Sequence, residues 1–198
     1  QPEFAPWHID LGDLLALMGQ SDLAKAEYES ALALAPDSAS ALLGLTYAAM
    51  SRGDQVAANT SIDKLMDLVP DAPQPYVARA QLFRVQGEND DARAELRKAL
   101  DRRDNYPPAI NKMGWTYLND NECDLAVRQF QTLMTEHPSS ADGLVGMGYA
   151  RLCDNDPTKA LEYLRKAAKL DPYDEWAQLG LGEAYQAQER WDESLLAF

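Results

Sequence analysis

The stretch that decides the fold runs from residue 107 to residue 140 and reads PPAINKMGWTYLNDNECDLAVRQFQTLMTEHPSS. Its length, 34 residues, is also the step at which small, turn-forming and helix-ending residues recur along the chain. The recurring positions are Ala24, Ala58, Ala92, Ala126 and Ala160; Gly19, Gly53, Gly87, Asn121 and Asn155; and Pro36, Pro70, Asp104, Pro138 and Pro172. A period of this length, with a small residue, a turn and a stop, predicts helix-turn-helix repeats that stack into a solenoid.

The repeat divides the chain into five complete units and a partial sixth. The units cover 5–38, 39–72, 73–106, 107–140 and 141–174, and the partial unit covers 175–198. We therefore expect a single array over residues 1–198. Because the sixth unit stops before its second half is complete, we expect the parent chain to continue with further repeats. The alternatives are that a partner covers this end or that copies of the array stack through it.

Each unit is expected to contain two helices joined by a short turn. Glycine and asparagine tolerate the left-handed backbone that ends a helix, so the Gly19 register predicts the end of each first helix. Acceptor side chains three positions later can cap the second helix, and a negative charge suits its N-terminus. The candidate caps are Asp22, Asp90, Asp124 and Asp192, with Thr158 in the fifth unit and Asp54 as a substitute in the second.

Small residues recur where the two helices of a unit must approach closely. In the first helices they are Gly12, Thr46, Ala80, Gly114, Gly148 and Gly182. In the second helices the recurring alanines are followed, on the same face, by Tyr28, Ile62, Leu96, Phe130 and Leu164. We expect these large side chains to form the core between the helices.

These residues resemble the tetratricopeptide repeat family over nearly the entire chain. The first unit carries the pattern at Leu11, Gly12, Ala24, Tyr28, Ala31 and Pro36, and the fourth at Gly114, Tyr117, Ala126, Phe130 and Pro138. The third unit departs from it, with Arg79 where a leucine is usual, and the fifth has Arg151 where a tyrosine is usual. The resemblance implies an all-α fold, a right-handed α-solenoid superhelix of about 5.5 helix-turn-helix units.

The resemblance also implies where a partner binds, because the first helices of this family line a concave groove that takes an extended or helical peptide. The groove residues implied in this way are Leu43, Tyr47, Gln81, Asn111, Trp115, Val145, Tyr149 and Glu183. Aromatic side chains bury a large area at little entropic cost, which suits them to capture a partner. Two alternatives stay open: the aromatic residues only pack between neighbouring helices, or a C-terminal segment of the same protein fills the groove.

Charge and hydropathy exclude several classes of partner. The formal net charge of −14 argues against nucleic-acid binding. The apolar runs fall far below the roughly 18 residues that span a bilayer, so direct membrane insertion is not expected. Some members of the family hold acidic chaperone tails in a clamp of basic residues, but Ile9 and Asp13 stand at the corresponding positions of the first unit. An acidic entrance formed by Asp10, Asp13 and Asp22 would favour a basic partner, and a merely solubilising acidic surface is the alternative.

Signals for catalysis are missing from the sequence. The two histidines, His8 and His137, lie near opposite ends of the array, and no phosphate-binding loop, metalloprotease motif or nucleophile elbow occurs. We therefore expect no enzymatic activity, no cofactor and no metal. Cys123 and Cys153 fall in turns on the same edge of adjacent units, so a disulfide is conceivable. Free thiols are the favoured prediction, because cysteine also serves as a small core residue.

We predict a non-enzymatic scaffold or adaptor that holds a protein or peptide segment in its concave groove, within a larger multiprotein assembly. One alternative is a structural module that self-assembles through its apolar C-terminal end, with Trp176, Trp191 and Phe198 as the candidate end-to-end interface. Another is the recruiting arm of a larger secretion, pilus or polysaccharide-export machine. The cytoplasm and the bacterial periplasm both stay open as compartments.

Overall fold

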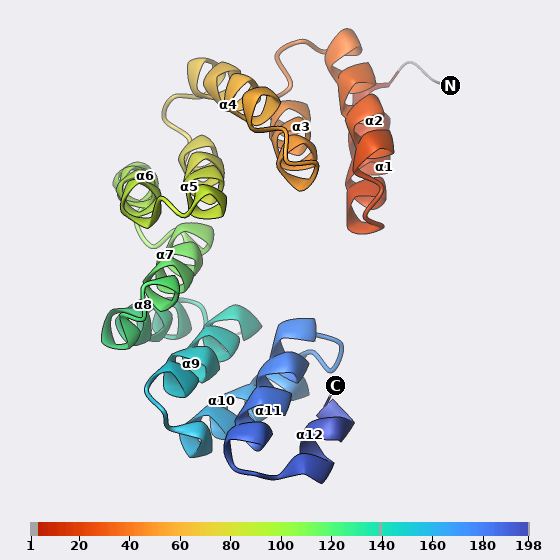
Figure 1. The fold of residues 1–198 in the computed structure, drawn as a ribbon. Helices are drawn as coiled ribbons and strands as arrows, with labels where there is room; N and C mark the ends of the chain where they lie inside the picture. The colour runs from red at the N-terminus through yellow and green to blue at the C-terminus, as the bar shows by residue number, and fades with distance from the viewer. Residues whose placement is uncertain (1–3, 139, 198) are drawn as a thin grey trace. The chain divides into compact units, whose positions relative to one another are not determined.

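The computed structural model describes residues 4–138 and 140–197, which form twelve α-helices and no strand (Figure 1). Contacts between Cα atoms group the chain into two compact halves, residues 1–103 and 104–198. The N-terminal half contains α1 (Ala5–Leu17), α2 (Ser21–Leu34), α3 (Ala39–Ser51), α4 (Gln55–Leu68), α5 (Gln74–Gln86) and α6 (Asn89–Arg102). The C-terminal half contains α7 (Pro107–Asn119), α8 (Cys123–Glu136), α9 (Ala141–Cys153), α10 (Pro157–Leu170), α11 (Glu175–Ala187) and α12 (Trp191–Ala197).

The helices alternate with great regularity in both halves. Each first helix, from α1 to α11, has 13 residues, and each second helix from α2 to α10 has 14. Within each half every helix packs on the next one. The first helices of neighbouring repeats are also in contact: α1 contacts α3, and α7 contacts α9. The predicted all-α fold of helix-turn-helix repeats is confirmed.

The core forms where the sequence pattern places it. The recurring alanines of the second helices are all 0% exposed, and so are Ile62, Leu96, Phe130 and Leu164. The first helix of a repeat lies very close to the second one. A Cβ atom on Gly114 of α7 would lie 2.5 Å from Cζ of Phe130 on α8. A Cβ on Gly12 would lie 2.7 Å from Cε1 of Tyr28. Small residues are therefore required at these crossings, because a larger one would overlap the ring that fills the core.

The turns inside the repeats use left-handed backbone at the predicted register. The φ angles are 72° at Gly19, 71° at Gly53, 81° at Gly87, 59° at Asn121 and 57° at Asn155. The same register continues to Glu189, whose φ is 60°, although its side chain does not suggest it. The register is thus a property of the repeat geometry, which imposes the conformation even where glycine and asparagine are absent.

The side-chain caps of the second helices lie two residues before the predicted register. Asp54, the predicted substitute, accepts a hydrogen bond from the Ala57 amide at 3.0 Å, and Asp156 accepts one from the Lys159 amide at 3.1 Å. The other candidates, Asp22, Asp90, Asp124 and Asp192, instead lie in the first helical turn, and Thr158 is the second residue of α10. Each second helix starts two residues after the left-handed residue. The predicted side chains therefore lie inside the helix, after the cap position. The charges of the aspartates still favour the positive end of the helix dipole.

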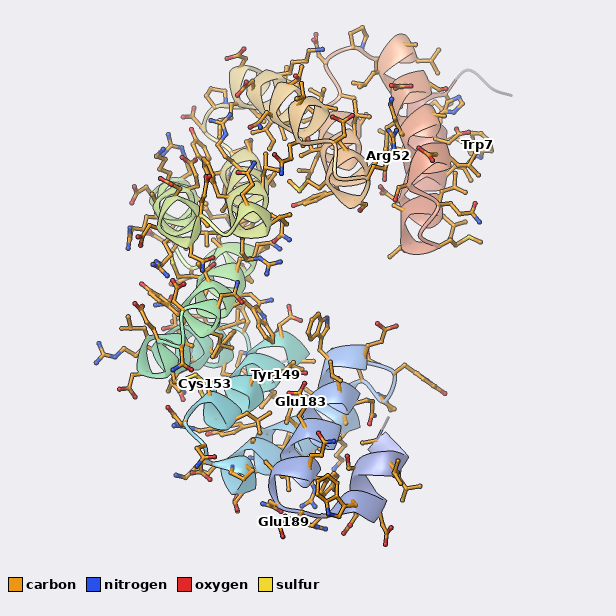
Figure 2. All side chains as sticks on the ribbon, viewed as in Figure 1. Trp7, Arg52, Tyr149, Cys153, Glu183 and Glu189 are labelled. Carbon is orange, nitrogen blue, oxygen red and sulfur yellow. A yellow bond between two sulfur atoms is a disulfide. The ribbon has the colours of Figure 1, made fainter. Side chains whose placement is uncertain are left out.

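The two cysteines form a disulfide, so the prediction of free thiols is wrong. The bond joins Cys123, at the start of α8, to Cys153, the last residue of α9 (Figure 2), and the two Cα atoms are 5.7 Å apart. This separation lies within the range that a disulfide spans. The turn between α7 and α8 and the end of α9 therefore meet at one edge of the C-terminal half.

Candidate functional site

In the N-terminal half, the predicted groove residues lie on α3 and α5, two helices in contact. Tyr47 is 38% exposed. Leu43 is half-buried and packs against the core around Ile62. Gln81 is half-buried too, and its Oε1 accepts a hydrogen bond from Nε of Arg84 at 3.4 Å. These three side chains offer a modest surface, with one exposed ring.

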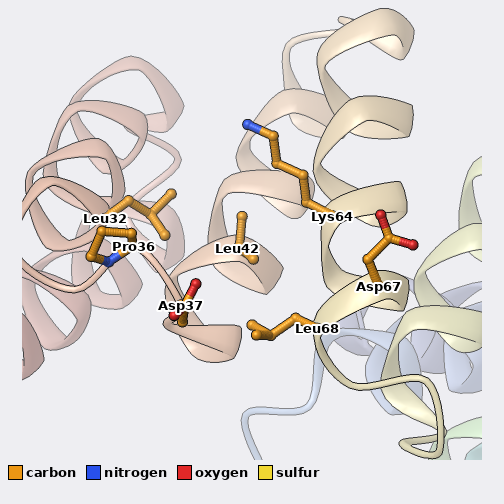
Figure 3. A pocket seen from close by; sticks show the side chains of 7 residues that line it. All are labelled: Leu32, Pro36, Asp37, Leu42, Lys64, Asp67 and Leu68. Carbon is orange, nitrogen blue, oxygen red and sulfur yellow. The ribbon is translucent and has the colours of Figure 1, made fainter.

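A pocket in this half lies on the side of the second helices. It is a pocket of about 510 Å³ between α2 and α4 (Figure 3). Its lining residues are Leu32, Pro36, Asp37, Leu42, Lys64, Asp67 and Leu68. The pocket combines three leucines with two carboxylates and one ammonium group, and none of the predicted groove residues lines it.

The C-terminal half gathers three aromatic rings from three successive first helices. Trp115 comes from α7, Tyr149 from α9 and Trp176 from α11. The ring centroids of Trp115 and Tyr149 are 5.1 Å apart, those of Trp115 and Trp176 5.6 Å, and those of Tyr149 and Trp176 6.2 Å. We call these three residues the aromatic cluster. Its rings meet at tilted or edge-to-face angles, which is the favoured geometry for aromatic pairs.

Contacts below and between the rings hold the cluster in place. Trp115 meets the buried Phe130 ring edge-on, with 5.8 Å between centroids. Val145, only 3% exposed, lies in the core on which Trp115 and Tyr149 pack, so it supports the rings and does not face solvent. The Tyr149 hydroxyl donates a hydrogen bond to the Trp176 carbonyl oxygen at 3.3 Å and ties α9 to the start of α11. These contacts within the chain position the three rings without a partner. Trp176 itself is 59% exposed to solvent.

Carboxylates lie near one ring of the aromatic cluster, Tyr149. Glu183 lies on α11, and Tyr149 lies on the neighbouring helix α9 (Figure 2). Burial raises the pKa of Glu183. Burial, and then the negative charges of Glu183 and Asp174, raise the pKa of the Tyr149 phenol. Burial and the charge of Asp174 also raise the pKa of Asp142, which Lys112 lowers in part. Two carboxylates, Glu183 and Asp174, therefore act on the Tyr149 ring.

Asn111 adds an acceptor beside the rings. It lies on α7 one helical turn before Trp115, and the two share a face. Its Oδ1 atom is buried and has no hydrogen-bond partner among the described residues. A buried amide oxygen without a partner costs free energy. Because this atom has almost no surface open to solvent, it does not itself face an incoming molecule.

The candidate end-to-end residues lie on different elements. Trp176 belongs to the aromatic cluster, whereas Trp191 lies on α12 and is 57% exposed. Phe198 lies outside the described residues. The sequence held a signal for the place of Trp176, because it precedes Leu179 by three residues and Glu183 by seven. That spacing puts all three on one face of α11.

Comparison with known proteins agrees with the repeat pattern. Family models described as tetratricopeptide repeat match residues 9–73, 112–140 and 151–196, together more than half of the chain. The chain therefore belongs to the tetratricopeptide repeat family. Its fold is the one that such repeats form.

Two curated relatives share limited identity with the chain. The Protein CTR9 homolog of Arabidopsis thaliana is 24% identical over 213 residues, which cover 84% of this chain and 19% of the relative. The Anaphase-promoting complex subunit CDC16 of Saccharomyces cerevisiae is 23% identical over 178 residues, which cover 86% and 21%. The chain thus spans about one fifth of the length of the curated relatives it matches.

Solved structures share the fold. The Cut9–Hcn1 hetero-tetramer of the APC/C has a TM-score of 0.80 at 17% identity, covering 100% of this chain and 41% of that one. TTC0263, a thermophilic repeat protein of Thermus thermophilus, has a TM-score of 0.78 at 20% identity, covering 97% and 99%. YrrB, described as having an unusual peptide-binding site, has a TM-score of 0.55 at 23% identity, covering 88% and 90%.

Two absences hold for residues 4–138 and 140–197. No group of three or more His, Cys, Asp or Glu side chains is placed to hold a metal ion in this part of the chain. None of its helices combines the length and the apolar character needed to cross a membrane.

Proposed function

We propose that this chain is a non-enzymatic scaffold or adaptor, and that its first helices hold a segment of a partner protein. The observation that carries the proposal is the aromatic cluster of Trp115, Tyr149 and Trp176, built from three successive first helices and left partly open to solvent. Preformed aromatic surfaces with a polar rim are typical of the residues that dominate binding energy at interfaces. Residues of the predicted groove, Asn111 and Glu183, lie around this cluster.

The relatives support the same class of function. CDC16 and Cut9–Hcn1 are named as parts of the anaphase-promoting complex, a multiprotein assembly, and YrrB is named for a peptide-binding site. Those partners belong to those proteins. For this chain we propose only the shared role, which is to hold another polypeptide within an assembly.

The test is affinity capture from a lysate of the source cells with two matched double variants. Trp115→Ala/Tyr149→Ala removes two rings of the cluster, and Phe4→Ala/Trp7→Ala removes two aromatic side chains of the N-terminal half that are 63% and 53% exposed. We expect the first variant to lose a protein that the wild type and the second variant both retain. Circular dichroism must show equal helix content in all three. Equal capture by all three would place the partner outside the cluster.

A second candidate, self-assembly, is favoured by one observation. Helix α12 exposes Trp191 by 57%, Leu195 by 76% and Leu196 by 88%. Apolar side chains gathered on one short helix are a typical contact for another protein surface. In this alternative the array stacks through α12, and the aromatic cluster plays no part.

A further inference from the structure

We infer that the aromatic cluster, together with Glu183 and Asp174, binds the cationic side chain of an arginine or lysine in the partner segment. The inference rests on the proposed function, since it names the chemistry of the segment held there. The partner is thus a basic, extended piece of polypeptide.

The rings provide the first half of the recognition. The face of an aromatic ring is negative, and a guanidinium or ammonium group within about 6 Å of the ring centre is attracted to it, most strongly by tryptophan. Trp176 is 59% exposed, so its indole is open to an arriving group. Its ring packs against the rings of Trp115 and Tyr149, and the Tyr149 hydroxyl fixes the Trp176 backbone by its hydrogen bond to the carbonyl oxygen. A cation therefore meets a ring whose position is supported by its neighbours.

The carboxylates provide the second half. Asp174 precedes Trp176 by two residues, and its carboxylate caps α11 by accepting a hydrogen bond from the Ala177 amide at 2.8 Å. Glu183 lies seven residues after Trp176 on the same face of α11. Both charges act on the Tyr149 phenol.

Burial raises the pKa of Glu183, which means that water solvates this carboxylate poorly. Lys112 is the cation that acts on the third carboxylate, Asp142. An incoming cation would stabilise the negative charge of Glu183 and Asp174, and an anion would be repelled by it.

The choice of a polypeptide follows from the extent of the cluster. The cluster draws its rings from three successive repeats, which suits a segment laid across the first helices. An arginine or lysine side chain of such a segment can then reach the rings and the carboxylates while its backbone lies along the same helices.

The experiment uses two fluorescein-labelled nonapeptides of glycine and alanine that differ at one central residue. That residue is arginine in one peptide and citrulline in the other, which keeps the shape and most hydrogen-bonding groups but removes the charge. Fluorescence anisotropy measures their affinity for the whole chain at low salt. We expect arginine to bind about tenfold more tightly than citrulline, as a partly desolvated cation on an aromatic face requires.

Matched variants locate the effect. Trp176→Ala and Glu183→Gln should each remove most of the arginine preference. Trp7→Ala, at a tryptophan of similar exposure, and Glu162→Gln, on the exposed side of α10, should leave it unchanged. Both test substitutions act on side chains outside the core, and Glu183→Gln preserves the size of the group, so folding should persist.

The possible outcomes distinguish a failure of the cation inference from a failure of the proposed scaffold function. Equal affinity for arginine and citrulline would overturn the cation inference, whether both peptides bind or neither does. The loss of a captured protein in Trp115→Ala/Tyr149→Ala would still support the scaffold function in that case. An arginine preference that survives Trp176→Ala and Glu183→Gln would place the cation elsewhere on this acidic chain and would also overturn the inference.

Discussion

At the scale of the residue, Glu189 occupies a conformation that suits glycine. Its φ of 60° lies in the left-handed region, and its amide donates to the Gln186 carbonyl oxygen at 2.9 Å to close α11. For a side chain with a Cβ atom, this region costs about 1 to 2 kcal/mol. Gly19, Gly53 and Gly87 avoid that cost at the equivalent turns of the first three repeats.

We predict that Glu189→Gly stabilises the protein by about 0.5 to 1 kcal/mol, because relief of backbone strain exceeds the added freedom of the unfolded chain. Urea unfolding followed by circular dichroism gives the change in midpoint. The matched control is Glu162→Gly, which puts glycine inside α10 and should destabilise by about 0.5 to 1 kcal/mol. A lower midpoint for Glu189→Gly would contradict the strain argument.

The residues that could be predicted from the sequence are those whose role repeats. The buried alanines, the large core side chains that include Tyr28 and Phe130, and the left-handed glycines and asparagines each recur every 34 residues, so one register explains five positions. Residues that do not recur in the repeat could not be placed in this way. The place of Trp176 depends on how α11 packs against α9, and the spacing of Cys123 and Cys153 is equally compatible with free thiols. Asp54 is confirmed as a cap, and the other cap predictions are wrong because the helix start depends on the turn conformation as well as on acceptor chemistry.

At the scale of the element, the disulfide ties two repeats together at one edge. It joins the start of α8 to the end of α9, with 30 residues of separation along the chain. The segment that it closes contains α8 and α9, including Phe130, Tyr149 and the core beneath the aromatic cluster. A crosslink of this kind restricts the unfolded chain, with a typical gain of about 2 to 4 kcal/mol.

We predict that Cys123→Ser/Cys153→Ser lowers the free energy of unfolding of the C-terminal half by about 2 to 4 kcal/mol. Reduction of the wild type with dithiothreitol should produce the same loss. Hydrogen exchange can assign the loss, since α8 and α9 should exchange faster while α2 and α3 stay unchanged. Identical exchange of α8 in the oxidised and reduced proteins would contradict a stabilising role for the bond.

At the scale of the whole molecule, two features act against each other in any association between copies. The formal net charge of −14 makes identical chains repel. The exposed Trp191, Leu195 and Leu196 of α12 instead provide an apolar contact surface. Salt screens the repulsion, because the Debye length falls from about 30 Å at 0.01 M to about 3 Å at 1 M, and it leaves the apolar contact intact.

We therefore predict that self-association, if α12 mediates it, strengthens with salt. Sedimentation velocity at about 0.01 M and about 0.5 M salt should show a shift from monomer towards larger species as repulsion is screened. Leu195→Glu/Leu196→Glu should abolish the shift, and the control Leu14→Glu/Leu17→Glu, at residues 54% and 87% exposed on α1, should preserve it. A monomer at every salt and protein concentration would remove self-assembly as a function of this surface. It would leave the aromatic cluster as the remaining candidate for partner binding.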